Sequence, residues 1–579
     1  MKCQNFRHLS AYAGLGYRFL YYDCRIITEQ FSVMNFNLNR RFLLVLALVA
    51  VGAEFQISYA QDAERIIPKD WHLLDPETDQ VQGLSVERTY QSMLKGKPAR
   101  SVLVAIIDSG IDINHEDLKS VIWTNPGEVA GNGLDDDANG YVDDIHGWSF
   151  IGSKSGNVNE DTYEITRELV RLSPQFENAD PARISRKDKK QFDYYLSVRS
   201  KYEQKLEEEG QQYKFYKRFY TTLKYGLDTL RHLIGPGPYT MERLDSLKSD
   251  QAAILFAKSA VMSFMRNAPG YDPIQGLEEL RETYEYYRML VEFGLNKNFN
   301  PRPVVGDNYS DKRERNYGSS DVIGPDPDHG THVAGIIGAD RSNDIGVKGI
   351  ADNVKLMVIR AVPNGDERDK DVANAIYYAV NNGAQIINMS FGKGLSPDKA
   401  IVDEAVRYAE QRKVLIIHAA GNDAENIDRV ENFPSRKPLS GKPSALWLEI
   451  GASDAGFEKG FVASFSNVGK KSVDLFSPGV NIYSTVPGNR YEDNSGTSMA
   501  APAATGVAAM LMSYFPEFSA AEIKNILMQS TRKFDGLKVK SPETGEDVTL
   551  DELCITGGMI NALEAVKLAS RLKPEGKTR

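Results

Sequence analysis

Cysteine is scarce in this chain of 579 residues, which contains three. Two of them, Cys3 and Cys24, precede a predicted signal cleavage point after Ala60, so the mature chain is expected to keep Cys554 alone. A single cysteine excludes an intramolecular disulfide, and stability must then come from the size of the core or from a bound metal. No cysteine accompanies the candidate functional residues described below, which argues against a thiol nucleophile.

The sequence also has no apolar run that is long enough to span a membrane. The apolar segment Phe42–Ala53 is shorter than the about 20 residues that a spanning helix needs. Arg40 and Arg41 precede it, and the small residues Ser58 and Ala60 follow, as in a secretory signal with its cleavage site. We therefore expect a secreted or periplasmic protein without a stable membrane span; an uncleaved anchor is the alternative.

This signal lies far from the first residue of the chain. Met34 stands just upstream of it, so residues 1–33 are interpreted as an over-extended translation start and residues 34–60 as the signal peptide. A lead segment at 61–95 then precedes the first predicted strand. The mature chain is expected to begin near Gln61.

An excess of positive charge is absent as well, since the formal net charge is −10. This acidic balance favours solubility and argues against nucleic acid as a partner. Hydrophobic residues make up 41% and charged residues 26%, proportions that are ordinary for a globular protein able to bury a large core.

Short apolar runs rich in β-branched residues are present, and they predict strands that are buried on both faces of a parallel sheet. Such runs occupy residues 101–107, 354–359, 385–389, 414–418 and 446–450. Helical patterns at 371–381 and 397–411 lie between them. The alternation predicts an α/β fold with a doubly wound, mainly parallel sheet in three α/β/α layers.

Strand-like runs are missing from residues 153–303. Apolar and aromatic residues recur there at helical spacing, as at Tyr195, Val198 and Tyr202, and predict helices with one aromatic-rich face. We interpret the segment as an all-α insertion whose tyrosines serve helix packing rather than a ligand site. The insertion would divide the main domain into parts at 96–152 and 304–572, followed by a tail at 573–579.

Four motifs place polar residues at the ends of predicted strands or helices. AIIDSG carries Asp108 at the end of the first strand, and AAGN carries Asn422 after another. HGTHVAG opens a predicted helix with His329, and SGTSMAAP leads into another with Ser498. In doubly wound sheets, catalytic groups collect at the carboxyl ends of the strands. An acid, a histidine and a serine gathered there would allow nucleophilic catalysis, because a serine hydroxyl needs an adjacent base.

In their chain order and flanking residues, these motifs closely resemble those of the subtilisin-like serine protease family. The resemblance covers somewhat over half of the chain and leaves out the insertion. It implies a serine endopeptidase that hydrolyses protein or peptide substrates through an acyl-enzyme, with Asp108, His329 and Ser498 as its catalytic triad. It also implies that Asn422 supplies an oxyanion-hole donor beside the Ser498 backbone N–H, and that catalysis needs no cofactor.

Two short segments are similar to the family's substrate-binding walls. They comprise Ser390, Phe391 and Gly392 after one predicted strand, and Ala419, Ala420 and Gly421 after another. An extended substrate would pair with such a strand end through backbone hydrogen bonds, while pockets would supply the choice of side chain. The small residues at 419–421 predict an S1 pocket with room for a sizeable P1 side chain.

An acidic stretch, DDDANGYVDD, starts at Asp135. The oxygen-bearing residues Asp135, Asp137, Asn139 and Asp143, with a glycine at the sixth position, predict a structural calcium site. The twelfth position holds His146 instead of the glutamate of a standard calcium loop. The alternative is an acidic turn whose carboxylates cap backbone N–H groups.

The sequence departs from the family pattern in three places. Asp108 and His329 are far apart in the sequence because the insertion enters between them, where we interpret it as restricting substrate access; a docking module is the alternative. The lead segment is too short for the N-terminal pro-domain that secreted relatives commonly carry, which puts autocatalytic activation in doubt. His418 precedes AAGN where an apolar residue is usual, and is interpreted as a hydrogen-bonded core histidine rather than a second acid or base.

Two other functions stay open on the sequence. One is a catalytically idle scaffold that binds peptides, which the complete set of triad and oxyanion residues disfavours. The other is an esterase or peptide ligase that uses the same triad, since the site sets the reaction class but not the acyl acceptor. The sequence does not indicate an oligomeric state.

Overall fold

The computed structural model describes residues 67–235, 237–267, 273–456, 460–534 and 536–572. The expected start region 1–33, the signal peptide 34–60, the first residues of the lead segment and the tail 573–579 lie outside them. The described residues form two compact units, one of 67–164 with 298–572 and the other of 165–297. None of the described helices is long and apolar enough to cross a membrane.

The first unit is built on a nine-stranded sheet. In order across the sheet, its strands are β12 (Arg532–Lys533), β15 (Gly558–Met559), β9 (Leu475–Pro478), β8 (Trp447–Ser453), β7 (Leu415–Ala419), β6 (Ile386–Met389), β1 (Val102–Asp108), β5 (Val354–Arg360) and β2 (Gly147–Ser149). Neighbours pair in parallel, except that β12 and β15 are antiparallel. From β1, the strands β6, β7, β8 and β9 follow in chain order on one side, and β5 lies on the other, which confirms the predicted doubly wound, mainly parallel α/β fold.

The five predicted strands are present as β1, β5, β6, β7 and β8, close to their predicted bounds. Their long apolar runs made them recognisable, because both of their faces are buried. The sequence does not predict β2, β9, β12 and β15, whose lengths are two to four residues. A run that short carries no readable hydrophobic period.

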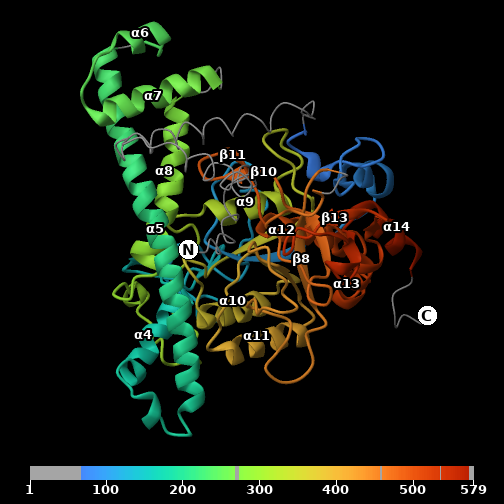
Figure 1. The fold of residues 1–579 in the computed structure, drawn as a ribbon. Helices are drawn as coiled ribbons and strands as arrows, with labels where there is room; N and C mark the ends of the chain where they lie inside the picture. The colour runs from blue at the N-terminus through green and yellow to red at the C-terminus, as the bar shows by residue number, and fades with distance from the viewer. Residues whose placement is uncertain (1–66, 236, 268–272, 457–459, 535, 573–579) are drawn as a thin grey trace, which may run out of the picture. The chain divides into compact units, whose positions relative to one another are not determined.

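Side chains of β1 alternate between two cores, because successive side chains of a strand point to opposite faces of the sheet. Val104 and Ile106 belong to the core shared with helices α9 (Asp328–Gly338) and α12 (Thr497–Tyr514). Ala105 and Ile107 belong to the core shared with α10 (Asp369–Asn381) and α11 (Lys399–Gln411). The sheet therefore lies between two helical layers, with α10 and α11 on one face and α9 and α12 on the other (Figure 1).

Smaller elements complete the first unit. The helices are α3 (Val86–Thr89), α13 (Ala520–Gln529) and α14 (Ala562–Arg571), and short hairpins pair β3 (Gly152–Ser153) with β4 (Gly156–Asn157) and β13 (Lys538–Lys540) with β14 (Asp547–Thr549). A third hairpin, β10 (Ile482–Val486) with β11 (Arg490–Asn494), bonds to the first turns of α9, where Thr485 Oγ1 donates to the Thr331 carbonyl at 2.7 Å. Cys554 is buried as a free thiol.

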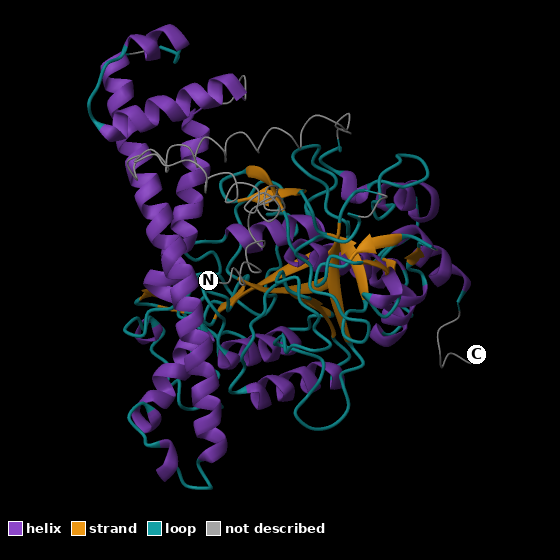
Figure 2. Cartoon of the chain, in the orientation of Figure 1, coloured by secondary structure: helices purple, strands orange, loops and turns teal. Residues whose placement is uncertain are grey.

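The second unit is helical, and no strand occurs among its described residues (Figure 2). Its helices are α5 (Lys189–Ile234), α6 (Met241–Ser246), α7 (Ala252–Asn267) and α8 (Pro273–Met289), while α4 (Glu164–Phe176) starts at the boundary. The long helix α5 packs against α7 and α8. Tyr216 stacks on Tyr287 with ring centroids 5.1 Å apart, and Tyr220 stacks on Tyr284 at 5.2 Å. These tyrosines serve helix packing.

Candidate active site

Three neighbouring strands bring polar residues to one edge of the sheet. β1 ends at Asp108, β6 is followed by Ser390, and β7 is followed three residues later by Asn422. β6 pairs in parallel with both β1 and β7, so the carboxyl ends of all three strands lie at the same edge. The fold thereby gathers one predicted residue from each of three distant motifs.

Asp108 and His329 are in direct contact. Nδ1 of His329 lies 2.7 Å from Oδ1 of Asp108, an oxygen that also accepts the Ser109 backbone N–H at 2.8 Å. The Asp108 side chain is 3% exposed, whereas the His329 side chain is 41% exposed, so the imidazole remains open to reactants on one side. A neutral imidazole that donates from Nδ1 to the carboxylate has Nε2 free to accept a proton.

Two glycines allow the start of α9 to approach the end of β1 this closely. A Cβ on Gly330 would lie 2.1 Å from the Gly110 carbonyl oxygen. Gly110 itself has a φ of +133°, and a Cβ there would lie 2.1 Å from the Ile323 carbonyl oxygen. Neither position can hold a side chain without moving the backbone, so the glycines of the two motifs are required for the contact between His329 and Asp108.

Ser498 lies in the first turn of α12, where backbone N–H groups have no intrahelical partner. Its Oγ donates to the Ser390 carbonyl oxygen at 3.1 Å, and Ser390 Oγ donates to the Ser498 carbonyl oxygen at 2.9 Å. Within the described structure, no hydrogen bond joins Ser498 Oγ to His329. A rotation of the serine side chain would be needed to form one, as is common in enzymes without bound substrate.

Asn422 is held through the oxygen of its side-chain amide. Oδ1 accepts the backbone N–H of Thr497 at 2.8 Å and the Thr497 hydroxyl at 2.9 Å. The hydroxyl oxygen in turn accepts the Gly421 backbone N–H at 3.1 Å. With Oδ1 fixed in this way, the Nδ2 group is left available next to Ser498. The SGTSMAAP motif contains Thr497, but its contact with Asn422 is not evident from the sequence.

The two histidines of HGTHVAG, His329 and His332, have pKa values that are shifted in opposite directions. Burial opposes protonation of His329, but the charge of Asp108 and the hydrogen bond to it, followed by the charges of Asp328 and Asp326, raise its pKa above the ordinary 6.5. Burial lowers the pKa of His332 to about 4, which keeps that ring neutral inside the fold. These surroundings suit His329 to proton transfer and His332 to a structural role.

The segment after β7 is fixed by two asparagines that the sequence does not single out. The Nδ2 groups of Asn467 and Asn432 donate to the Ala420 carbonyl oxygen at 2.9 and 3.0 Å. Gly421 has a φ of +101°, and a Cβ there would lie 2.4 Å from Asn467 Nδ2. Ala419 and Ala420 are buried, while Gly421 is partly exposed. Of the three predicted S1 residues, Gly421 is therefore the one that lies at the surface of the site.

Residues 99–552 match the subtilase family. The chain belongs to the subtilase family. A thermophilic serine proteinase of Bacillus sp. (strain AK1) is 37% identical over 209 residues, covering 36% of this chain and 48% of that protein. Alkaline elastase YaB of Bacillus sp. (strain YaB) is 33% identical over 298 residues, covering 49% and 71% respectively.

A third relative is the major intracellular serine protease of Bacillus subtilis (strain 168), which is 36% identical over 218 residues. The match covers 37% of this chain and 63% of that protein. This subtilase thus spans about half the length of the Bacillus AK1 relative and about two thirds of the two others.

The predicted calcium ligands of this subtilase have separate partners in the structure. Asp135 accepts the backbone N–H groups of Asn139 and Gly140 at 3.0 and 2.8 Å. Asp143 accepts those of Gly131 and Gly133 at 2.8 and 3.0 Å. These two carboxylates thus cap backbone groups, which is the role of the alternative interpretation of the stretch.

Asp137 also caps a backbone group, the Asn139 N–H at 3.0 Å, and it belongs to a cluster of carboxylates with Glu128 and Asp144, whose nearest oxygens all lie within 4.8 Å of one another. Glu128 Oε2 is buried without a hydrogen-bond partner among the described residues. Asp144 is buried and accepts the side-chain amide of Asn125 at 2.8 Å. Three converging carboxylates with an unpartnered buried oxygen suit a hard cation such as Ca²⁺.

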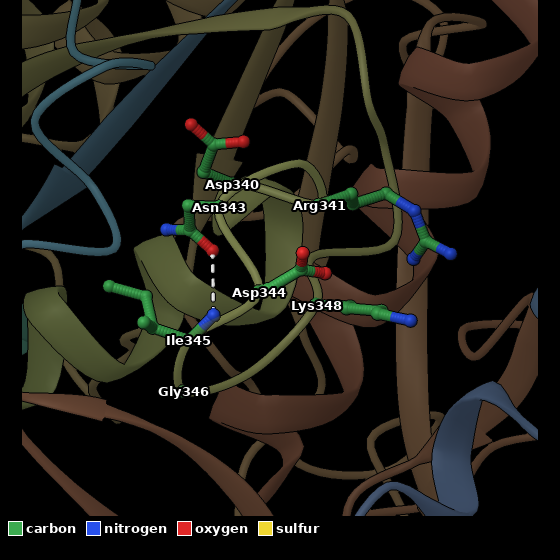
Figure 3. A pocket seen from close by; sticks show the side chains of 7 residues that line it. All are labelled: Asp340, Arg341, Asn343, Asp344, Ile345, Gly346 and Lys348. Atoms are coloured by element: carbon green, nitrogen blue, oxygen red, sulfur yellow. Dashed lines mark hydrogen bonds between the residues drawn. The ribbon is translucent and has the colours of Figure 1, made fainter.

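A polar cavity of about 240 Å³ is lined by residues of the loop 340–348 (Figure 3). The loop that lines it, residues 340–348, follows the C-terminal end of α9, whereas His329 is in the first turn of that helix. Eleven helical residues separate the two ends by about 16 Å. Asn343 Oδ1 accepts the Ile345 backbone N–H at 3.2 Å within the loop (Figure 3). The cavity is therefore not a substrate pocket of the triad.

Proposed function

We propose that this subtilase is a serine endopeptidase in which Asp108, His329 and Ser498 hydrolyse peptide bonds through an acyl-enzyme. The observation that carries the proposal is the 2.7 Å contact between His329 Nδ1 and Asp108 Oδ1. This contact fixes the tautomer of the imidazole that can accept a proton at Nε2. The family match over residues 99–552 supports the same reaction class.

The reaction starts when Ser498 Oγ leaves the Ser390 carbonyl and turns toward His329. Nε2 of His329 takes the hydroxyl proton as Oγ attacks the scissile carbonyl carbon, and Asp108 stays ionised and stabilises the imidazolium. The imidazolium then donates the proton to the leaving amine, which yields the acyl-enzyme. Water attacks the ester in the second half of the reaction with the same base, and this step releases the acid and the free serine.

Two N–H donors are proposed to stabilise the tetrahedral intermediate. The Nδ2 group of Asn422 and the backbone N–H of Ser498 would bind the oxyanion as negative charge develops on it. The hydrogen bonds from Thr497 to Asn422 Oδ1 support this assignment, because they leave Nδ2 as the available atom.

The substrate is proposed to be an extended protein or peptide chain that pairs with Ser390–Gly392. Ser390 lies next to the nucleophile, since its carbonyl accepts the Ser498 hydroxyl. Gly421, at the surface of the site, would border an S1 pocket that takes a sizeable P1 side chain. Profiling P1 with a peptide library checks this; acceptance of Gly and Ala alone would contradict it.

We place the enzyme outside the cytoplasm, because residues 34–60 have the pattern of a secretory signal. One subtilase relative is named an intracellular protease, so family membership alone does not determine location. N-terminal sequencing of the protein recovered from cell fractions tests the proposal. An exported protein that begins near Gln61 is expected, and a cytosolic protein that retains the signal would refute it.

A structural calcium ion is proposed at Glu128, Asp137 and Asp144. Binding to the folded state alone would raise the melting temperature in proportion to the logarithm of the metal concentration. We expect a chelator to lower the melting temperature of the wild type and to have no effect on Glu128→Gln. Equal chelator effects on the two proteins would contradict the site.

The proposed activity is tested by labelling the folded protein with a fluorophosphonate probe, which reacts with an activated serine. The wild type is expected to label and Ser498→Ala is not. Cleavage of casein or of peptides then separates an endopeptidase from an esterase. Absence of labelling in a folded wild type would refute the proposal in favour of an idle scaffold.

A further inference from the structure

His418 is a fully buried histidine on β7, directly before the segment that leads to Asn422. Both of its ring nitrogens have partners. Nε2 lies 2.8 Å from the Phe391 carbonyl oxygen, and Nδ1 lies 2.8 Å from Oε1 of Glu449. A carbonyl oxygen can only accept, so Nε2 carries a hydrogen and donates it to Phe391.

Glu449 orients this ring from the neighbouring strand β8. Its Oε2 accepts the indole N–H of Trp447 at 2.7 Å, and its backbone N–H donates to Asp474 at 2.7 Å. One proton must lie between His418 Nδ1 and Glu449 Oε1, either on the imidazole or on the carboxyl group. In both cases Nε2 keeps its hydrogen, so the donor to Phe391 does not depend on which partner holds the shared proton.

The Phe391 carbonyl, which accepts the hydrogen bond from His418, belongs to the segment Ser390–Gly392, and this segment contacts the proposed nucleophile Ser498. Ser390, the preceding residue, exchanges hydrogen bonds with Ser498 at 3.1 and 2.9 Å. The register of the sheet places Met389 of β6 opposite His418, so the ring lies beside the point where β6 ends and this segment begins. The Phe391 and His418 rings also meet edge to face, with centroids 6.4 Å apart.

We propose that His418, oriented by Glu449, is a positioning residue that fixes the peptide unit between Phe391 and Gly392 for pairing with the substrate backbone. The proposal rests on the proposed endopeptidase function. Without the donor at Nε2, the Phe391 carbonyl would lose its only buried side-chain partner among the described residues. The peptide unit could then rotate, and the strand end would no longer present a fixed set of backbone groups.

Two substitutions separate the two hydrogen bonds of the ring. In His418→Gln, the amide nitrogen falls near the place of Nε2 and can still donate to Phe391. In His418→Asn, the shorter amide falls near the place of Nδ1 and can reach Glu449 alone. Both variants remove the ring and its packing, so any difference between them reports the bond to Phe391.

The experiment compares wild type, the Gln variant and the Asn variant with an extended peptide, a short ester and a fluorophosphonate probe. In the Asn variant we expect KM for the extended peptide to rise about tenfold, with kcat, ester hydrolysis and labelling rate within about threefold of wild type. The Gln variant is expected to restore KM. Ile417→Val, on the same strand, controls for a change in core packing.

Equal KM values for the Gln and Asn variants would overturn the proposal, as would a loss of labelling parallel to the loss of peptide cleavage. If the Asn variant does not fold, Glu449→Leu provides the test, since it removes the orienting group but keeps the ring. It is expected to raise KM with labelling retained, and an unchanged KM would refute the role of Glu449. A folded wild type that neither labels nor cleaves would refute the proposed function and the positioning role together.

Discussion

At the scale of single residues, the proposed oxyanion donor Asn422 is oriented by Thr497, a residue that does not contact the reacting atoms in the proposed mechanism. Thr497 holds Asn422 Oδ1 through two hydrogen bonds, at 2.8 and 2.9 Å. Turning the amide over would place its NH₂ group against the Thr497 N–H, where two donors face each other and the hydrogen bond is lost. The hydrogen bonds that Oδ1 accepts therefore set the orientation of the Asn422 side chain.

Substitution of Asn422 by Ala is expected to lower kcat by about 10²–10³, the range known for removal of the oxyanion donor in subtilisin itself. Thr497→Val is expected to lower kcat by about five- to tenfold, because one neutral hydrogen bond contributes about 1 kcal/mol. Thr497→Ser keeps the hydroxyl and serves as the control. Steady-state kinetics on one peptide substrate check all three variants; a raised KM at unchanged kcat in Thr497→Val would contradict the orienting role.

The carboxylates around His329 set the pH range of the enzyme. The base must be neutral to accept a proton, so its raised pKa moves the acid limb of kcat/KM above pH 6.5, and activity is lost as the pH falls through this pKa. Asp328→Asn or Asp326→Asn removes a charge that favours the imidazolium, so the limb should move to lower pH. The shift should shrink at high salt because these charges are partly exposed. An acid limb that stays in place or moves to higher pH in both variants would argue against this account.

At the scale of elements, a buried ionic network ties the segment that follows the helical unit to α10. The guanidinium of Arg302 makes two hydrogen bonds to Asp371, at 2.6 and 2.9 Å, and contacts Asp307 at 2.7 Å. The side chains of Asp371 and Asp307 are 0% exposed, and that of Arg302 is 8% exposed. Charges buried to this degree are tolerated only as a complete network.

Arg302→Met is expected to destabilise the first unit by about 3–5 kcal/mol, because it leaves the buried carboxylate of Asp371 without its cationic partner and Asp307 with Lys370 alone. The exposed pair between Lys224 and Asp228 lies on α5 in the helical unit, so Lys224→Met is the control and should leave the unfolding midpoint of the first unit unchanged. All four tryptophans lie in the first unit, so denaturant unfolding followed by tryptophan fluorescence reports on it. Equal midpoints for wild type and Arg302→Met would contradict the prediction.

The sequence predicts those parts of the fold and of the candidate site that depend on a short, continuous stretch of residues. The central strands are readable because both faces are buried, and Asp108 is readable because it ends such a strand inside a motif. The relation between Asn422 and Thr497 needs the fold, since it joins two motifs that are far apart in the chain. The same holds for the bond between His418 and Glu449, whose partners lie on neighbouring strands.

The acidic stretch illustrates the limit of spacing arguments. Alternate oxygen-bearing residues predict a ligand set that includes Asp135 and Asp143, and both of these carboxylates accept backbone N–H groups of the turn. The oxygens that converge are those of Glu128, Asp137 and Asp144. Glu128 lies before the stretch, and no sequence period connects it to the others.

At the scale of the whole molecule, the chain holds a catalytic unit and a helical unit that each have their own core. The core of the helical unit comprises Leu223, Leu227, Leu230, Leu244, Ile254, Ala257, Val261 and Leu280. Its helix α5 has 46 residues and is about 70 Å long. A helix of this length gains most of its stability from packing against α7 and α8. The helical unit is therefore expected to fold without the catalytic residues.

Replacing residues 165–297 by a flexible Gly/Ser linker tests whether this unit restricts access to the triad. Every strand of the main sheet and every proposed catalytic residue lies outside the deleted segment, so fluorophosphonate labelling should persist. Because the segment enters the chain between Asp108 and His329, we expect its removal to raise the rate of casein cleavage relative to that of a tetrapeptide. Ser498→Ala in both backgrounds corrects for contaminating proteases. An unchanged or lower ratio in a variant that still labels would mean that the helical unit does not exclude proteins, and would favour a role in substrate docking.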